Sequence, residues 1–368
     1  MDFKAAVLHR PKTPIAIETV TAAALGPDDV LVRMRASSLC HTDLEVIEGE
    51  LVYPAPIVLG HEAAGVIEEV GSAVTHPRRG DPVVLSWNPH CGHCFYCDDD
   101  QPILCETYRG LGPKAVQFNG KTQLSLGGKP VHHMMYVASF AEYCIVPAQS
   151  AVVMPRELPF DRACLIGCGV MTGVGGAINI AQIPYGGSAM VIGCGAVGLS
   201  AVQGARLAGA ASIIAVDLDS RKLALAASLG ATHCIDAAEN DAVAAAKDLT
   251  RGRGVDCVLE AAGDPRAFRL SVEAVRPGGR VVWLGKVNVD REVEFRWGTL
   301  MGEKRIVRSS YGGGRPLRDF PWLVHQYLEG RLKLDELITR RIPLEQINGG
   351  FDAIRRGETV REVVVFPG

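Results

Sequence analysis

Four cysteines stand close together in the first third of the chain, at a spacing that suits a metal ion. Cys91, Cys94 and Cys97 are three residues apart, and Cys105 follows eight residues later. Thiols at this spacing on an irregular loop can converge on one ion and complete the tetrahedron that Zn²⁺ takes in closed sites. Disulfides are the alternative, but crowded cysteines in a chain without an export-signal pattern favour metal binding. We predict a structural zinc lobe, which carries no chemistry because four thiolates leave no open coordination position.

A glycine-rich loop in the middle of the chain predicts a dinucleotide site. The loop consists of Gly193, Cys194, Gly195, Ala196, Val197 and Gly198. It follows a predicted strand at 189–192 and opens a predicted helix at 199–208. Gly193 would permit the tight turn, Gly195 would let backbone N–H groups approach a pyrophosphate, and Gly198 would let the helix pack against the strand. The phosphates would then lie at the positive end of the helix.

Asp217 indicates which dinucleotide binds. It ends the next predicted strand, nineteen residues after Gly198. A carboxylate here can accept both hydroxyls of an adenosine ribose, and its charge would repel a 2′-phosphate, so NAD is favoured over NADP. Arg221 and Lys222 leave NADP open, because a nearby cation could hold a phosphate. The alternative for Asp217 is a solvated carboxylate in a turn.

The elements that must position these residues fall into two parts. A chain of 368 residues exceeds what one hydrophobic core usually serves, so two domains are expected. Up to about residue 155, short β-branched runs such as 30–33, 64–70 and 82–85 predict a mainly β domain. From about residue 170, apolar strands alternate with Ala- and Leu-rich helices, the signature of a doubly wound parallel sheet with crossover helices. Its clearest predicted strands lie at 189–192, 212–216, 255–259 and 280–284.

A glycine-rich break at 312–314 precedes a tail that ends in a predicted strand at 362–366. This tail is expected to rejoin the first domain. The predicted α/β organisation is therefore a mainly β domain at 1–169, a Rossmann NAD-binding domain at 170–310, and a return to the first domain at 311–368.

Composition argues against several classes of partner. The net charge of -3 offers no attraction to nucleic acid or to acidic membranes. No run reaches the roughly 18 uninterrupted apolar residues that a membrane helix requires. Eleven cysteines fit a reducing compartment, so a cytoplasmic location is expected.

Three other candidate metal ligands are scattered along the chain. They are Cys40, His61 and Cys168. Each one alone is weak, because a buried cysteine is usually a packing residue and a lone histidine is usually a core or surface group. Their spacing does not decide between these interpretations.

Several motifs together resemble the zinc-dependent medium-chain alcohol dehydrogenases over nearly the whole chain. The matching segments are Ser38-Leu-Cys-His-Thr-Asp43, Leu59-Gly-His-Glu-Ala-Ala-Gly65, the four-cysteine lobe, Cys164-Leu-Ile-Gly-Cys-Gly169, Val191-Ile-Gly-Cys-Gly-Ala-Val-Gly198 and Ile347-Asn-Gly-Gly-Phe-Asp352. In that family a GroES-like catalytic domain is interrupted by a Rossmann domain. The resemblance implies hydride transfer between a small-molecule alcohol or aldehyde and NAD, with one catalytic and one structural Zn²⁺ per chain.

The resemblance also assigns roles around the catalytic zinc. It places Cys40, His61 and Cys168 on the ion, with one position left open for substrate or water. In the same way it implies that Asp43 fixes the imidazole of His61, that Glu62 is a carboxylate close to the metal, and that Thr42 hydrogen-bonds the alcohol. Liver-type relatives pass the proton to solvent through a histidine where this chain has Glu45. We expect Glu45 or a chain of waters to do this instead, with a solvated helix residue as the alternative.

The remaining positions implied by the resemblance concern cofactor and substrate. His41, Lys222, Arg361 and Thr172 match cofactor-contacting positions, and Thr172 matches a residue beside the nicotinamide ring. Trp87, Met134 and Met135 match the substrate channel. Together these three favour medium-sized apolar or aromatic primary alcohols, although each could equally belong to the core.

Three other functions remain open at this stage. Arg109, four residues after Cys105, suits a glutathione-linked formaldehyde dehydrogenase, but Leu51 stands where that class tends to carry an acidic group. A zinc-ribbon module fused to a cofactor-sensing Rossmann domain is disfavoured by the acidic run 98–100. A zinc-free reductase would not need both sets of ligands. Relatives associate through their Rossmann domains, usually as homodimers and sometimes as homotetramers.

Overall fold

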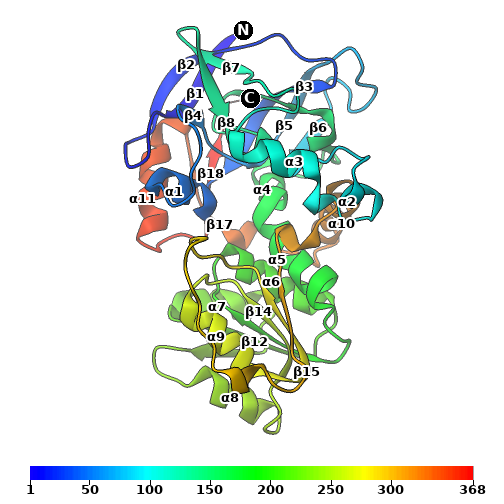
Figure 1. Ribbon diagram of the computed structural model, residues 1–368, viewed down its shortest axis with the longest axis vertical. Coiled ribbons are helices and arrows are strands. Elements are labelled where there is room, and N and C mark those ends of the chain that lie inside the picture. The colour runs from blue at the N-terminus through cyan, green and yellow to red at the C-terminus, as the bar shows by residue number, and fades with distance from the viewer. Residues whose placement is uncertain (368) are drawn as a thin grey trace. The chain divides into compact units, whose positions relative to one another are not determined.

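The computed structural model describes residues 1–367 and divides into two compact units (Figure 1). The first unit comprises residues 1–168, 315–329 and the chain from Leu337 onward, and the second comprises 169–314 and 330–336. The tail therefore contributes to both units: its first residues and the short segment 330–336 lie with the second one.

The first unit is built from a small closed barrel and a larger mixed sheet. The barrel order is β1 (Asp2–Leu8), β2 (Ala16–Ala22), β7 (Leu124–Leu126), β8 (Lys129–His133) and β4 (Ile57–Val58). The sheet order is β10 (Ala151–Val153), β6 (Pro82–Leu85), β5 (Glu62–Val70), β3 (Asp29–Ser38), β18 (Arg361–Val365) and β17 (Ile338–Ile342), with β9 (Tyr143–Pro147) also paired to β3. The red C-terminal strand β18 thus pairs with the blue strand β3 (Figure 1).

Six α-helices accompany these sheets within the described residues of the first unit. They are α1 (His41–Glu48), α2 (Phe95–Asp98), α3 (Glu106–Leu111), α4 (Phe160–Leu165), α10 (Pro316–Leu328) and α11 (Ile347–Arg355). Helix α1 follows β3 directly, and a reciprocal cap between Cys40 and Asp43 defines its start. It ends at Gly49, whose φ of 76° lies in the left-handed region that glycine adopts freely. This placement brings Cys40 and Asp43 to the end of a central strand.

A long apolar helical segment, Phe160–Ala181, begins with α4. Its composition would allow it to cross a membrane, but 78% of its most apolar window is buried, as in a core helix. The segment contains two π-helical stretches, Ile166–Val170 and Gly176–Ala181, and α5 (Met171–Gly175) lies between them. Cys168 lies on the first stretch, and π-turns are frequent at functional sites. A Cβ at Gly167 would lie 2.8 Å from the carbonyl oxygen of Leu85, so glycine permits this close approach to β6.

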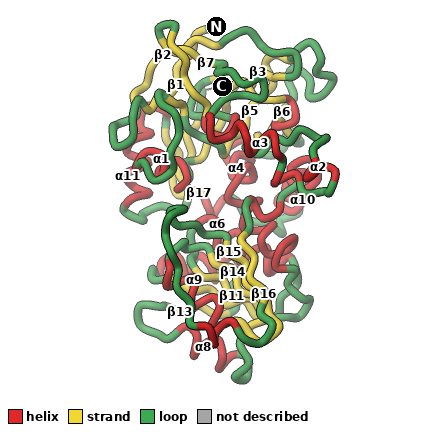
Figure 2. The backbone as a smooth tube through the Cα atoms, viewed as in Figure 1, coloured by secondary structure: helices red, strands yellow, loops and turns green. Residues whose placement is uncertain are grey.

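The second unit is a six-stranded parallel sheet flanked by helices (Figure 2). The strand order is β13 (His233–Asp236), β12 (Ser212–Asp217), β11 (Ser188–Ile192), β14 (Val255–Glu260), β15 (Val275–Trp283) and β16 (Arg305–Arg308). The helices are α6 (Ala196–Leu207), α7 (Ser220–Leu229), α8 (Ala242–Leu249) and α9 (Pro265–Ala274). The strand order reverses between β11 and β14, which is the switch point where open α/β sheets bind their ligands. The predicted doubly wound sheet is confirmed.

Candidate active site, metal centres and cofactor site

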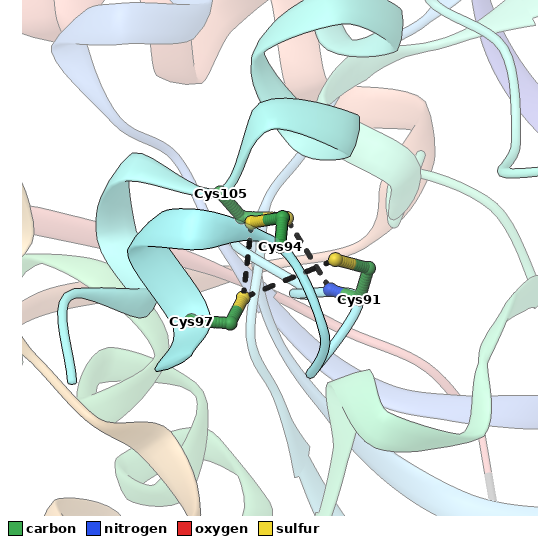
Figure 3. Close-up of side chains that lie close together, drawn as sticks. All are labelled: Cys91, Cys94, Cys97 and Cys105. Carbon is green, nitrogen blue, oxygen red and sulfur yellow. Dashed lines mark hydrogen bonds between the residues drawn. The ribbon is translucent and has the colours of Figure 1, made fainter. Parts of the chain in front are cut away.

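The four cysteines of the predicted structural lobe converge around one point (Figure 3). The Sγ atoms of Cys94 and Cys97 are 3.6 Å apart, and those of Cys91 and Cys97 are 4.0 Å apart. A tetrahedral Zn²⁺ with bonds of about 2.3 Å to sulfur would hold its thiolates about 3.8 Å apart. A disulfide would bring two sulfurs to about 2.05 Å, and all four cysteines are free thiols. Their separation therefore fits a shared zinc ion and not a disulfide.

Local structure explains how the lobe cysteines meet. Gly92 has a φ of 80°, so the chain can turn sharply after Cys91. Cys94 caps the single turn of α2, which carries Cys97, and Cys105 caps α3. The backbone N–H of Cys91 donates to the Sγ of Cys105 at 3.3 Å. Short helical turns and one glycine thus fold the loop around the ligands.

Protonation in the lobe also indicates that a cation belongs there. Burial and its thiol neighbours Cys94 and Cys105 together raise the pKa of Cys97 to about 12. At Cys91, hydrogen bonds from the His93 backbone and from Thr107 overcome the effect of burial and lower the pKa to about 6. One thiolate therefore forms readily while a second resists ionisation, and a Zn²⁺ ion would supply the charge that allows all four to ionise.

The three scattered ligand candidates also converge. Ligand atoms of Cys40, His61, Glu62 and Cys168 all lie within 4.8 Å of one another. Cys40 ends the loop before α1, His61 immediately precedes β5, and Cys168 lies on the π-helical stretch. The convergence joins segments that are 21 and 107 residues apart, which spacing alone could not show.

Hydrogen bonds to Asp43 hold two of the ligand segments of this second cluster. The Oδ1 of Asp43 accepts the backbone N–H of Gly60 at 2.9 Å and lies 3.2 Å from Nδ1 of His61, while Oδ2 accepts the backbone N–H of Cys40 at 3.1 Å. Asp43 and His61 are 0% and 1% exposed, so water does not compete for these bonds. The carboxylate therefore fixes the proton of His61 on Nδ1 and turns Nε2 towards the two thiols.

The cluster fits a zinc ion by the same physical criteria as the lobe. Nε2 of His61 is buried and makes no hydrogen bond within residues 1–367, a costly state for a nitrogen that no metal binds. The Cys168 thiol lowers the pKa of Cys40 by hydrogen bonding, and the same bond raises the pKa of Cys168. Two sulfurs thus share one proton in a buried site, and a cation would displace it.

Two charged residues adjoin the cluster. Arg361 donates from Nη2 to Oε1 of Glu62 at 2.8 Å, and both side chains are buried. Burial raises the pKa of Glu62 to about 7, although Arg361 opposes the shift. Arg361, predicted to contact the cofactor, is here the ion-pair partner of Glu62. Thr42 is the second residue of α1 and Glu45 lies three residues later, on the same face of the helix.

The glycine-rich loop has the geometry that a dinucleotide requires. Gly193 has a φ of 88°, and a Cβ there would lie 2.7 Å from the backbone N of Ala262. A Cβ at Gly198 would lie 1.7 Å from the carbonyl oxygen of Gly193, so the start of α6 packs tightly under the loop. By contrast, a Cβ at Gly195 would meet no atom within 4 Å. That open space at the helix N-terminus fits a pyrophosphate.

Three backbone N–H groups fix the side chain of Asp217, the predicted ribose acceptor. Its Oδ2 accepts the backbone N–H of Cys194 at 2.6 Å, and its Oδ1 accepts those of Leu218 and Asp219 at 2.8 and 2.9 Å. Arg221 points its guanidinium at Asp219, with an Nη2 to Oδ2 distance of 2.8 Å. Of the two cations that left NADP open, Arg221 is therefore paired with a neighbouring carboxylate.

The remaining predicted cofactor residues lie in both units. His41 is the exposed first residue of α1, and Arg361 begins β18, so both belong to the first unit. Lys222 lies on α7 and its charge lowers the pKa of Cys194, which places it near the glycine-rich loop. Thr172 lies on α5 and is 9% exposed. Their contacts with a cofactor stay predictions.

Trp87, one of the predicted substrate residues, stands at the end of a row of aromatic rings. The ring centroids of Trp87 and Tyr108 are 6.1 Å apart, those of Tyr108 and Tyr136 are 5.4 Å apart, and those of Tyr136 and Phe118 are 5.1 Å apart. Burial raises the pKa of Tyr108, and the charges of Tyr53, Tyr136 and Cys168 raise it further. Trp87 is half-buried against the core.

The two methionines differ from one another. Met134 is 0% exposed and belongs to the core of the first unit, which favours its packing role. Met135 is half-buried and has a φ of 48°.

Sequence reasoning missed Tyr53 and Tyr108. Tyr53 lies close enough to Asp43 for the carboxylate, together with burial, to raise its pKa to about 12. The one sequence signal for Tyr108 was its position three residues after Cys105.

Comparison with known proteins agrees with this geometry. A family described as "Alcohol dehydrogenase GroES-like domain" matches residues 26–156, and one described as "Zinc-binding dehydrogenase" matches 196–329. The chain is 35% identical to an alcohol dehydrogenase class-3 of Cereibacter sphaeroides, over the full length of both chains.

Solved structures give the same result. A zinc-binding domain alcohol dehydrogenase protein of Burkholderia ambifaria is 37% identical, with a TM-score of 0.96. The benzyl alcohol dehydrogenase of Acinetobacter calcoaceticus is 33% identical, with a TM-score of 0.95, and both structures cover 100% of each chain. The chain belongs to the zinc-dependent medium-chain alcohol dehydrogenases. It is an oxidoreductase that, like its family, depends on NAD and zinc.

Proposed function

We propose that this enzyme oxidises medium-sized apolar or aromatic primary alcohols to aldehydes with NAD. The observation that carries the proposal is the aromatic cluster of Trp87, Tyr108, Tyr136 and Phe118, in which Cys168 contributes to the raised pKa of Tyr108. Aromatic side chains bind a flat apolar group by offset and edge contacts, so they favour a benzyl-type alcohol over ethanol. The benzyl alcohol dehydrogenase of similar structure supports the same substrate class.

We assign Cys40, His61 and Cys168 as ligands of the catalytic zinc and the lobe cysteines as ligands of the structural zinc. When bound, the catalytic ion supplies a Lewis acid that lowers the pKa of the substrate hydroxyl towards neutrality. Asp43 holds His61 in the tautomer that ligation needs. Gly193, Gly195 and Gly198 shape the cofactor loop, with Ala196 and Val197 opening α6, and Asp217 accepts the ribose hydroxyls.

Proton removal is assigned to residues of α1. Thr42 lies two residues after the ligand Cys40, so its hydroxyl is available to accept a hydrogen bond from the substrate hydroxyl. Glu45 follows on the same face and offers a carboxylate for passing the proton to solvent. Glu62 stays paired with Arg361 close to the ligands.

A substrate panel with NAD reduction as the readout tests the proposed substrate class. We expect kcat/KM for benzyl alcohol to exceed that for ethanol by about a hundredfold or more, because an aromatic ring buries far more apolar surface. Replacing Tyr108 by alanine should raise the KM for benzyl alcohol and leave that for ethanol nearly unchanged. Equal kcat/KM for both alcohols would refute the proposal.

The second candidate is oxidation of the glutathione adduct of formaldehyde. Arg109 favours it, because this exposed cation in the last turn of α3 could bind a glutathione carboxylate. Leu51 is half-buried against the core and supplies no charge. Rates with S-(hydroxymethyl)glutathione and with free alcohols, measured on the same preparation, separate the two candidates.

Assembly and location complete the proposal. We propose a homodimer, or a homotetramer made from such dimers, in the cytoplasm. Strand β16 is an edge strand of the second sheet, and Val307 on it is exposed, as are Trp297 and Met301 just before it. Such an edge suits pairing with a second copy. The eleven free cysteines suit a reducing compartment. Light scattering on the purified protein measures the assembly.

A further inference from the structure

One buried carboxylate in the second unit has no part in the chemistry assigned so far. Glu260 is the last residue of β14 and is 0% exposed. It pairs in register with Ile192, the residue before Gly193, so it lies at the switch point of the sheet. A carboxylate is rarely fully buried unless bonds hold it there.

The Glu260 side chain holds a tight loop in place. Its Oε1 accepts the backbone N–H groups of Ala262 and Gly263 at 2.8 and 2.7 Å. Its backbone carbonyl oxygen accepts those of Leu284 and Gly285 at 2.8 and 2.9 Å. One residue thereby ties the end of β14 to the loop after it and to the chain that leaves β15.

This junction forms the wall against which the first cofactor glycine packs. A Cβ at Gly193 would lie 2.7 Å from the backbone N of Ala262, and a Cβ at Gly285 would lie 2.5 Å from Oε2 of Glu260. Gly263 has a φ of 69°, and a Cβ there would lie 2.5 Å from the carbonyl oxygen of Lys286. Among the described residues, no side chain separates this backbone from the glycine-rich loop, so a displacement of residues 262–263 would displace the loop as well.

We propose that Glu260 is a positioning residue for the dinucleotide, which fixes residues 262–263 behind Gly193 and thereby pre-organises the loop that binds the pyrophosphate. The proposal concerns the NAD site that the family shares, and it is independent of the proposed substrate class. A loop already held in its binding conformation loses less entropy when the cofactor binds, so affinity rises. The ionised carboxylate holds the two N–H groups more strongly than the neutral acid does.

Opposing effects set the pKa of Glu260. Burial raises its pKa to about 7, the two backbone N–H groups lower it, Arg308 on β16 lowers it further and Asp264 raises it. Its Oε2 makes no hydrogen bond with any described residue. Because the folded pKa lies above the unfolded value of 4.5, the folded state binds the proton more tightly. This contribution to the free energy of unfolding is complete below about pH 4.5 and is lost as the pH rises through about 7.

The test compares two carboxylates at opposite ends of β14. Glu260→Ala removes the acceptor of two N–H groups at the cofactor end. The matched control is Asp256→Asn, because Asp256 accepts the backbone N–H of Ser188 at 2.8 Å and Nε of Arg276 at 2.7 Å at the other end. The dissociation constant of NADH is measured by fluorescence on the zinc-loaded enzyme. We expect Glu260→Ala to weaken NADH binding about tenfold or more and Asp256→Asn to leave it within about twofold.

Glu260→Gln provides the measurement if the alanine variant does not fold. It keeps an acceptor of the same shape but cannot ionise. Between pH 6 and pH 8, the NADH affinity of the wild type should rise more than that of this variant. Over the same range, the free energy of unfolding should fall more in the wild type than in the variant. Unchanged NADH affinity in Glu260→Ala, equal weakening in Asp256→Asn, or parallel pH profiles in wild type and Glu260→Gln would each overturn the proposal.

Discussion

The two clusters of metal ligands in the first unit are built in opposite ways. The lobe collects Cys91, Cys94, Cys97 and Cys105 within fifteen residues, three of them only half-buried. The second cluster brings together Cys40 just before α1, His61 and Glu62 at the start of β5, and Cys168 on a π-helical stretch, and Asp43 hydrogen-bonds the first two of these segments. The lobe needs only a local turn, while the second cluster needs the whole domain to fold first. Four thiolates close a structural site, whereas two thiolates and one imidazole leave a position open for chemistry.

The two clusters should differ most in what happens when one ligand is removed from each: one loss should affect turnover and the other should affect folding. Replacing Cys168 by alanine should lower turnover by at least about 10³-fold, because the Lewis acid is lost, while the fold persists. Circular dichroism and the melting temperature should stay close to wild type. Comparable unfolding in this variant and in a lobe variant would remove the proposed division of labour.

A lobe variant should show the reverse pattern. Replacing Cys94 by alanine should cost about 3 kcal/mol and lower the melting temperature by roughly 10 °C, since structural zinc contributes directly to folding. Cys234 is an exposed thiol outside both clusters, and its alanine variant serves as the control in differential scanning calorimetry. A melting temperature equal to that of the control would contradict a structural role for the lobe.

A smaller effect should come from the carboxylate beneath the second cluster. Asp43→Asn should weaken zinc binding there by about 10- to 100-fold, because His61 loses its fixed tautomer. Titration with a competing chelator measures this affinity, and the lobe zinc of the same protein is the internal control. If both ions leave together, Asp43 does not belong to one cluster alone.

The smallest effect concerns the proton route. Glu45→Gln should shift the pH dependence of turnover and reduce kcat by about tenfold or less, because the residue acts only after the hydroxyl proton has left the substrate. The control is Glu48→Gln at the end of the same helix. An unchanged pH profile would clear Glu45 of the role and leave a chain of waters.

The same contrast explains what the sequence could predict. The lobe and the glycine-rich loop were predicted from spacing because their ligands and turns are local. Cys40, His61 and Cys168 needed a family resemblance, because their meeting depends on sheet pairing and on a π-turn that no periodicity announces. The contacts of Trp87 with Tyr108 and of Tyr108 with Tyr136 were missed for the same reason, because these rings come from separate segments of the chain. The ion pair of Arg361 with Glu62 was also unforeseen, because it joins residues 299 positions apart.

Zinc analysis of the purified enzyme combined with anomalous diffraction at the zinc edge tests the central claim most directly. The account predicts two ions per chain, one among the four lobe sulfurs and one bound by Cys40, His61 and Cys168. A single ion per chain, or a second ion bound away from these three side chains, would contradict it.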